Sequence, residues 1–320
     1  MRTDRRRLLA GLATAPALVS AVTAFAQSRP LVLGTATPGG GFPAYGDALL
    51  DALRRTDPDL PIEARNTKGS TENVPMLERG ELDLGLVTGE VAYEAVSGIG
   101  RPPSPVKVVA AMYSQPGMFV VRADSPARTI ADLRGKPVAF GARGSGLVVL
   151  VRYVLDGLGL DTERDFGAVY LDRAGDGPAM VADGRVAALW GAGLGWPGFS
   201  AVASAPGGAR FIAPDASAIE AIRRKHPFLK ALLVPARTYP GQDAPIASVG
   251  SWAFIMARPD LDEAVAYRFA KTLHAAERVL AERLPLAAET KASNTVAAVA
   301  SPDLLHPGVA RYLREVSILR

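Results

Sequence analysis

The most constraining feature of this sequence is an order that repeats along it: a short apolar run, a glycine-rich loop and an amphipathic helix. Residues 31–33, 82–87 and 137–140 form apolar runs, and glycine-rich loops at 37–41 and 141–146 follow two of them. Short apolar runs are typical of buried strands, and strands that alternate with helices favour a mostly parallel sheet. The sequence therefore predicts an α/β fold.

The alternation comes in two series. The first ends with a strand expected at 106–112, and the second begins near Met118. In the first series, Pro75 is expected to lie close to the start of its helix, because proline is tolerated in a first turn. After the second series, a strand at 249–257 precedes a long amphipathic helix that begins near Asp260. A chain of 320 residues commonly forms two domains.

The N-terminus has the pattern of a secretory signal peptide over residues 1–26. Four arginines precede an apolar run, and the small-x-small sequence at 24–26 is typical of a cleavage site. Arg5 and Arg6 before two leucines resemble a twin-arginine signal, although the general export route and an uncleaved anchor stay open. We therefore expect a periplasmic protein. Without this segment the formal net charge falls from +4 to +1, so the basic composition does not indicate nucleic acid.

Composition excludes several kinds of site. The chain has no cysteine, which excludes thiol nucleophiles, iron–sulfur centres and disulfide scaffolds. It has three histidines, none within a catalytic or metal-binding motif, so we expect no metal, no cofactor and no enzymatic activity.

Three loops are candidate ligand sites, because loops after strands open onto the crevice of an α/β sheet. The loop at 34–42 spaces its glycines like a phosphate loop, but Gly40 and Gly41 stand where the lysine and hydroxyl residue are required, which excludes a nucleotide-hydrolysing loop. Its backbone N–H groups suit a smaller anion, or the glycines serve only a tight turn. Ser70 and Thr71 could cap a helix, contact a ligand or do both.

The third loop contains Arg143 and Ser145. It lacks the glycine two residues before the serine that a nucleophile elbow requires, because Arg143 occupies that position. A guanidinium beside free N–H groups would make a bidentate carboxylate clamp, and a solvated loop arginine is the competing interpretation.

Together these loops resemble the TAXI-type solute-binding proteins of TRAP transporters. The resemblance covers nearly all of the chain after residue 26. A single short motif would be weak evidence for this family, whereas so many motifs in the same order are specific to it. The segments that carry it are residues 34–40, 69–73, 81–87, 91–93, 121–125, 130–136, 141–146, 238–243 and 305–308.

The resemblance implies a type II periplasmic-binding-protein fold, with two lobes, a hinge and a ligand cleft. Lobe 1 would comprise residues 27–117 and 250–320, and lobe 2 residues 118–249. The ligand would be a small organic acid or amino acid, glutamate-like compounds being familiar in the family, and the partner a TRAP membrane permease. We expect a monomer with no nucleic-acid partner.

The resemblance also implies which loops bind the ligand. Glu90, if it faces the cleft, could pair with a ligand ammonium and would favour an amino acid; if it does not, a di- or oxo-acid is favoured. The candidate ligand-binding residues are Thr37, Gly39, Gly40, Phe42, Tyr45, Ser70, Thr71, Asn73, Glu90, Arg143, Gly144, Ser145, Gly146 and Trp190. Two other functions stay open: a subunit that presents its ligand to a membrane sensor kinase, and an exported hydrolase. A neighbouring permease or kinase gene would separate transport from sensing.

Overall fold

The computed structural model describes residues 29–320, so the predicted signal peptide lies outside the described residues. Within them, every helix is too short or too polar to cross a bilayer.

The described strands form one ten-stranded sheet, in the order β2-β1-β3-β10-β4-β7-β5-β6, with β8 paired to β4 and β9 to β10. Their bounds are β1 (Leu31–Gly34), β2 (Ile62–Arg65), β3 (Leu84–Thr88), β4 (Lys107–Arg122), β5 (Pro137–Ala142), β6 (Gly167–Leu171), β7 (Ala188–Ala192), β8 (Ala209–Ile212), β9 (Lys230–Val234) and β10 (Ile246–Ala257).

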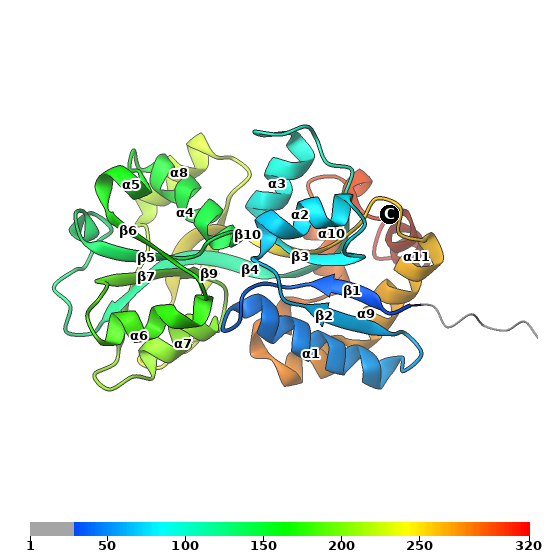
Figure 1. The fold of residues 1–320 in the computed structure, drawn as a ribbon, viewed down its shortest axis with the longest axis horizontal. Helices are drawn as coiled ribbons and strands as arrows, with labels where there is room; N and C mark the ends of the chain where they lie inside the picture. The colour runs from blue at the N-terminus through cyan, green and yellow to red at the C-terminus, as the bar shows by residue number, and fades with distance from the viewer. Residues whose placement is uncertain (1–28) are drawn as a thin grey trace, which may run out of the picture.

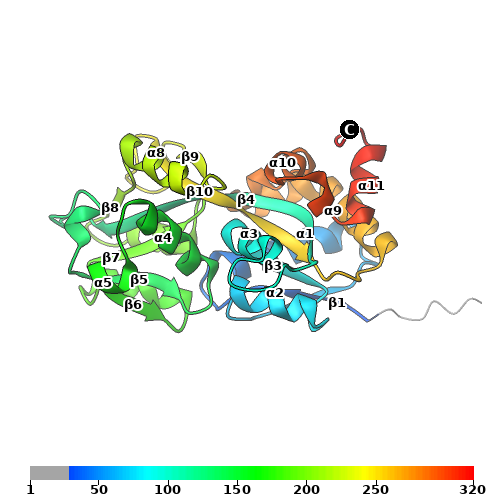
Figure 2. The same cartoon turned by 90° about the horizontal axis from the view of Figure 1, so that it is seen from above.

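The sheet is mixed rather than mostly parallel. The pairs β1–β2, β1–β3, β5–β6 and β5–β7 are parallel, but β4 and β10 run antiparallel to each other and to their other neighbours. Both are long strands that pass through the two halves of the molecule (Figures 1 and 2).

The expected break between residues 112 and 118 is wrong, because β4 is one strand of 16 residues. Pro116 pairs with Gly250 of β10, where a Cβ atom would lie 1.9 Å from the carbonyl oxygen of Gln115. A residue without a side chain therefore lets β10 approach β4 closely beside the proline, and the ladder continues.

Helices cover both faces of the sheet in each half (Figure 1). Their bounds are α1 (Gly41–Thr56), α2 (Ser70–Glu78), α3 (Gly89–Ser97), α4 (Gly146–Gly157), α5 (Thr162–Asp165), α6 (Gly177–Ala182), α7 (Pro197–Ala203), α8 (Ala216–Lys225), α9 (Glu263–Arg283), α10 (Ala292–Ala298) and α11 (Pro307–Glu315).

Two buried apolar clusters form the core. The first extends from Val32 to Tyr113 and from Ala253 to Leu319, with Val149 added, and the second extends from Met118 to Val249. We call the parts around them lobe 1 and lobe 2. The residue boundaries expected for the lobes stay a prediction, and they fall within β4 and β10.

The expectation for Pro75 is also wrong, because α2 begins at Ser70 and Pro75 lies inside it. Proline removes the hydrogen bond that its N–H would donate to the carbonyl of Thr71 four residues earlier. Thr71 is exposed, so water can replace that donor, while the buried side chains of Val74 and Leu77 hold the helix on the core.

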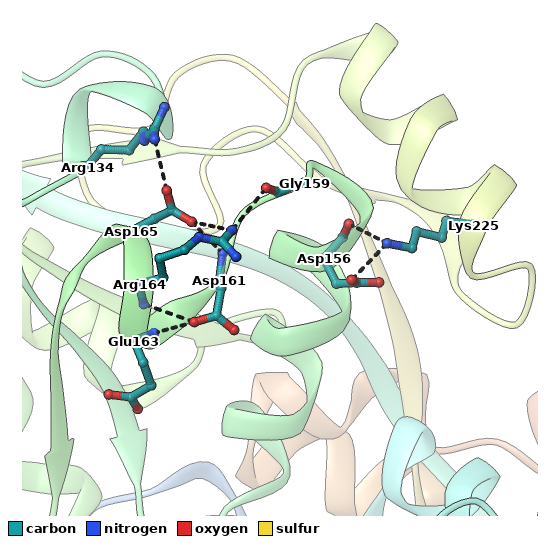
Figure 3. Close-up of polar contacts among 8 residues, drawn as sticks. All are labelled: Arg134, Asp156, Gly159, Asp161, Glu163, Arg164, Asp165 and Lys225. Carbon is teal, nitrogen blue, oxygen red and sulfur yellow. Dashed lines mark hydrogen bonds and ion pairs between the residues drawn. The ribbon is translucent and has the colours of Figure 1, made fainter.

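Polar contacts at the outer end of lobe 2 fix the short elements there (Figure 3). Asp161 caps α5 by accepting from the backbone N–H groups of Glu163 and Arg164, both at 2.9 Å. The ammonium of Lys225 on α8 lies 2.8 Å from the Asp156 carboxylate on α4. These are exposed contacts, so each adds little stability and mainly fixes geometry.

Candidate functional site

A cavity between the lobes is surrounded by the N-terminal ends of four helices of nine or more residues. Residues at the starts of α1, α2 and α4 line it, as does Thr88, the N-cap of α3. The first N–H groups of a helix have no partner within the helix, and the helix dipole places partial positive charge there. Four such ends create a positive potential without any cationic side chain, which suits a small anion.

The cavity encloses about 460 Å³ of space not filled by atoms, part of it open to solvent. Among residues 29–320, no charged side chain and no histidine lines it. Its polar groups come mainly from hydroxyls and one amide, and aromatic and aliphatic side chains form the rest of the wall. The lining residues are Ala36, Thr37, Gly40, Gly41, Phe42, Gly69, Ser70, Thr88, Tyr113, Gln115, Ala142, Ser145, Gly146, Leu147, Ala174, Ala192 and Trp196.

Three buried polar atoms at or beside this cavity have no hydrogen-bond partner in the described part of the chain: Thr88 Oγ1, Gln115 Oε1 and Glu90 Oε1. Thr88 and Gln115 line the cavity directly. Leaving a buried polar group unpaired costs about 1–3 kcal/mol. A ligand in the cavity that supplies partners for Thr88 Oγ1 and Gln115 Oε1 would remove that cost for those two atoms.

Glu90 is buried next to the cavity but does not line its wall. The hydroxyl of Ser251 on β10 donates to its carboxylate at 2.5 Å. Burial raises the pKa of the Glu90 carboxyl to about 7, and the Ser251 hydrogen bond opposes that rise. A carboxyl with this pKa changes charge near neutral pH.

Hydrogen bonds join the two lobes beside the cavity at two places. At the first, the Thr71 hydroxyl in lobe 1 donates to the Gly144 carbonyl in lobe 2 at 2.8 Å, and the Thr71 backbone N–H donates to the same oxygen at 3.2 Å. At the second, the backbone N–H of Ala174 donates to Thr37 Oγ1 at 3.2 Å. These contacts describe a closed arrangement of the lobes.

Glycines permit this close approach. Gly39 has φ of 84°, and a Cβ atom there would lie 2.5 Å from the Cα of Gly175 in the opposite lobe. At Gly146 a Cβ atom would lie 2.0 Å from Thr88 Oγ1. Side chains at these positions would hold the lobes apart.

The structure brings most of the predicted residues to this region. Six of them line the cavity: Thr37, Gly40, Phe42, Ser70, Ser145 and Gly146. Gly39, Thr71 and Gly144 lie at the contacts between the lobes.

Two predicted side chains take other roles here. Asn73 donates to the carbonyls of Thr35 and Leu86 at 2.9 and 2.8 Å, so it holds loops in place behind the cavity. Ser70 does not cap α2, because its hydroxyl oxygen accepts from the Thr88 backbone N–H at 3.1 Å.

Three further predicted residues also lie outside the cavity wall. The Tyr45 hydroxyl is buried in the core beside Thr290 Oγ1, at 3.1 Å. Trp190 is buried in lobe 2 and donates to the Leu147 carbonyl at 3.0 Å. The Arg143 side chain is exposed and lies over the Tyr170 ring, 5.2 Å from its centroid, so it does not reach the cavity as a clamp.

Sequence reasoning missed several wall residues, above all Tyr113, Gln115 and Trp196. A signal existed for Gln115, since it and its neighbour Ser114 are polar residues in the middle of the mostly apolar β4, and both are buried there. Trp196 follows a glycine-rich stretch at 191–195 and is the N-cap of α7, which resembles the position of the predicted loops.

Comparison with solved structures supports the two-lobed fold. The alkanesulfonate-binding protein from Xanthomonas axonopodis pv. citri, bound to MOPS, is 20% identical, with 91% of this chain and 84% of that chain covered and a TM-score of 0.51. A structure described as a periplasmic transporter is 15% identical, with 81% and 86% covered and a TM-score of 0.53.

A hydrogen-peroxide-bound OxyR mutant from Corynebacterium glutamicum is 14% identical, with 81% of this chain and 67% of that chain covered and a TM-score of 0.51. At these identities the likeness concerns the fold alone. The expected α/β, two-lobed type II periplasmic-binding-protein fold is thereby confirmed. The model of the NMT1-like family matches residues 33–316. The chain therefore belongs to the NMT1-like family.

Proposed function

We propose that this protein is an extracytoplasmic solute-binding protein that captures a small organic anion, a carboxylate or an amino acid, for a TRAP-type transporter. The observation that carries the proposal is the convergence of four helix N-termini on an uncharged cavity between two lobes. Binding rather than turnover is favoured because, in the part of the chain that the structure describes, neither a histidine nor a charged side chain lines that cavity.

The charge of the ligand follows from the electrostatics of the wall. Each helix N-terminus stabilises an anion by about 0.3–1 kcal/mol, and by up to about 2 kcal/mol where it is partly buried. Hydroxyls of Thr37, Ser70 and Ser145 lie beside these ends and can donate to the same group. Since the described residues place no arginine or lysine in the wall, the anion would be held by neutral donors.

The polarity of the cavity wall limits the ligand further. Phe42, Tyr113 and Trp196 provide apolar surface, so the ligand would carry an apolar part beside its charged group. Glutamate-like compounds fit this description, and so do short organic acids.

Closure of the lobes would complete the site. A ligand docked on the N–H groups of one lobe is enclosed when the other lobe rotates about β4 and β10, which excludes water and strengthens each hydrogen bond. The contacts of Thr71 with Gly144 and of Ala174 with Thr37 would then hold the closed form and present a surface to a permease.

The location and partner rest on sequence features and on the resemblance. The basic and apolar pattern of residues 1–26 supports export to the periplasm, by either route. The TAXI resemblance supports a TRAP permease as the partner, whereas the structural neighbours support solute binding in general.

Mass spectrometry of small molecules released from gently purified, then denatured, protein tests the proposal. We expect one organic anion in near-stoichiometric amount. A thermal-shift panel should follow, with glutamate, 2-oxoglutarate and an alkanesulfonate at equal concentration. If no anion is released and none of the three raises the melting temperature, the proposal fails.

A further inference from the structure

A second cavity lies beside α3, and Gly89 at the start of that helix belongs to its wall. We call the first cavity, between the lobes, the cleft. The second cavity encloses about 1060 Å³ of space not filled by atoms, partly open to solvent, which is more than twice the space of the cleft on the same measure. We call it the α3–α10 cavity, because α3, β10 and α10 form most of its wall. Nothing in the proposed function uses it.

Its wall is built from regular apolar faces. Gly89, Ala92, Tyr93, Val96 and Ser97 recur at helical spacing, so one face of α3 points into this space. On β10, Trp252, Phe254 and Met256 alternate with residues of the opposite face and line the same space. Small residues of α3 and α10 leave room where larger ones would have filled the core.

The mouth of the cavity is aromatic. Tyr93 is 37% exposed, although it is one of the large hydrophobic residues. Its ring stacks on that of Phe228 from lobe 2, with centroids 4.2 Å apart and planes at 13°. Tyr153 packs edge-on against Phe228 at 4.9 Å, which fixes this pair. The wall therefore joins both lobes.

One charged side chain, Lys230, lines the cavity. Within residues 29–320 no carboxylate lies within 4 Å of its ammonium group. A solvated lysine needs no partner, but here it stands at the edge of a mostly apolar and aromatic wall. The other polar side-chain groups of this wall are the hydroxyls of Ser97, Ser251 and Tyr93 and the indole N–H of Trp252, and the Ser251 hydroxyl already donates to Glu90. That combination is complementary to an amphipathic anion.

We propose that the α3–α10 cavity is a second binding site, which takes an organic anion with an aromatic or aliphatic body. The body lies against Trp252, Tyr93 and Phe228, and the anionic group pairs with Lys230. This site differs from the cleft in its chemistry: the cleft holds charge with backbone N–H groups and hydroxyls, whereas this cavity holds an apolar body with side chains and has one cation.

Calorimetry with naphthalene-2-sulfonate tests the proposal, with naphthalene-2-methanol as the uncharged comparison. We expect saturable one-to-one binding of the sulfonate and weaker binding of the alcohol. Ala298→Phe and Ala92→Leu each fill the cavity, and either should lower the affinity for the sulfonate by at least about tenfold. Ala201→Phe makes a matching change on an exposed face of α7 and should leave the affinity unchanged.

Lys230→Gln tests how much the positive charge of Lys230, as opposed to the shape of the cavity, contributes to the affinity for the sulfonate. It should lower the affinity for the sulfonate by up to about fivefold, the range of an exposed ion pair, and leave the alcohol unaffected. A thermal melt of each variant shows whether it folds. If one of the two cavity-filling variants does not fold, the other still tests the proposal.

Three results would overturn the proposal: no saturable binding of the sulfonate, unchanged affinity in a folded filling variant, or displacement of the probe by the anion released from the cleft. The last result would place the probe in the cleft. Because the probe is supplied and its site is defined by variants outside the cleft, failure here leaves the proposed function intact.

Discussion

Replacing Gly146 by alanine should prevent full closure of the lobes without destabilising either lobe. Gly146 is the first residue of α4 in lobe 2, and a Cβ atom there would lie 2.0, 2.5 and 2.7 Å from Oγ1, Cγ2 and Cβ of Thr88. Rotation of the Thr88 side chain cannot relieve the overlap, because its Cβ atom is itself too close. Carbon atoms pack at about 3.5–4.0 Å, so the two helix starts must separate by about 1 Å or more.

The magnitude follows from the cost of overpacking, typically about 1–3 kcal/mol. Since this strain exists only when the lobes meet, it would appear as a loss of ligand affinity of about 5- to 150-fold. The isolated lobe should not suffer, because alanine favours a helix over glycine by about 1 kcal/mol. The melting temperature without ligand should therefore stay equal or rise.

The assay compares calorimetric affinity for the released ligand with the melting temperature of the ligand-free protein. Thr88→Ala in the same chain removes Oγ1 and Cγ2, so the double variant should recover part of the affinity. Val148→Ala, on the same helix and outside the cavity wall, serves as a control. If Gly146→Ala binds within about twofold of the wild type, the argument from closure is refuted.

Three further predictions follow from named contacts. Burial raises the pKa of Glu90 from 4.5 to about 7, so the folded state holds a proton that the unfolded state has lost, and stability should fall by up to roughly 3 kcal/mol as pH rises from 4.5 through 7. Glu90→Gln should flatten that part of the urea-unfolding profile, and an unchanged pH dependence would disprove the assignment. Thr71→Val removes the hydroxyl that donates to Gly144, which should weaken ligand binding about fivefold in calorimetry; equal affinity would mean that this contact does not support closure. Arg143→Ala should change affinity by less than about threefold, because the guanidinium lies over Tyr170 outside the cavity, and a tenfold loss would return Arg143 to the site.

Much of the local structure was predictable because it depends on short-range patterns. The apolar runs and helical spacings placed most strands and helices, and the α/β class followed from their alternation. The exceptions have particular causes. The continuity of β4 through Pro116 depends on Gly250, which is 134 positions away in the sequence, and the interior position of Pro75 depends on packing that outweighs one lost hydrogen bond.

The candidate site was predictable only in part. Loops at helix starts are local features, so Thr37, Gly40, Ser70 and Gly146 could be named from the sequence. The local sequence does not decide whether a side chain points into the cavity. Tyr45 and Trp190 are buried in the core, while Gln115 and Trp196 reach the cavity from elements distant in the sequence.

The sequence by itself therefore determined the elements, the fold class and the glycine-rich loops, because each depends on residues a few positions apart. Only the tertiary structure decided that four helix N-termini meet at one uncharged cavity, that Glu90 is buried behind it, and that a second, apolar cavity lies beside α3. The reason is the order of the strands in the sheet. Strand order depends on pairing between segments far apart in the sequence, which no short sequence pattern encodes, and it decides which loops and helix starts lie next to one another.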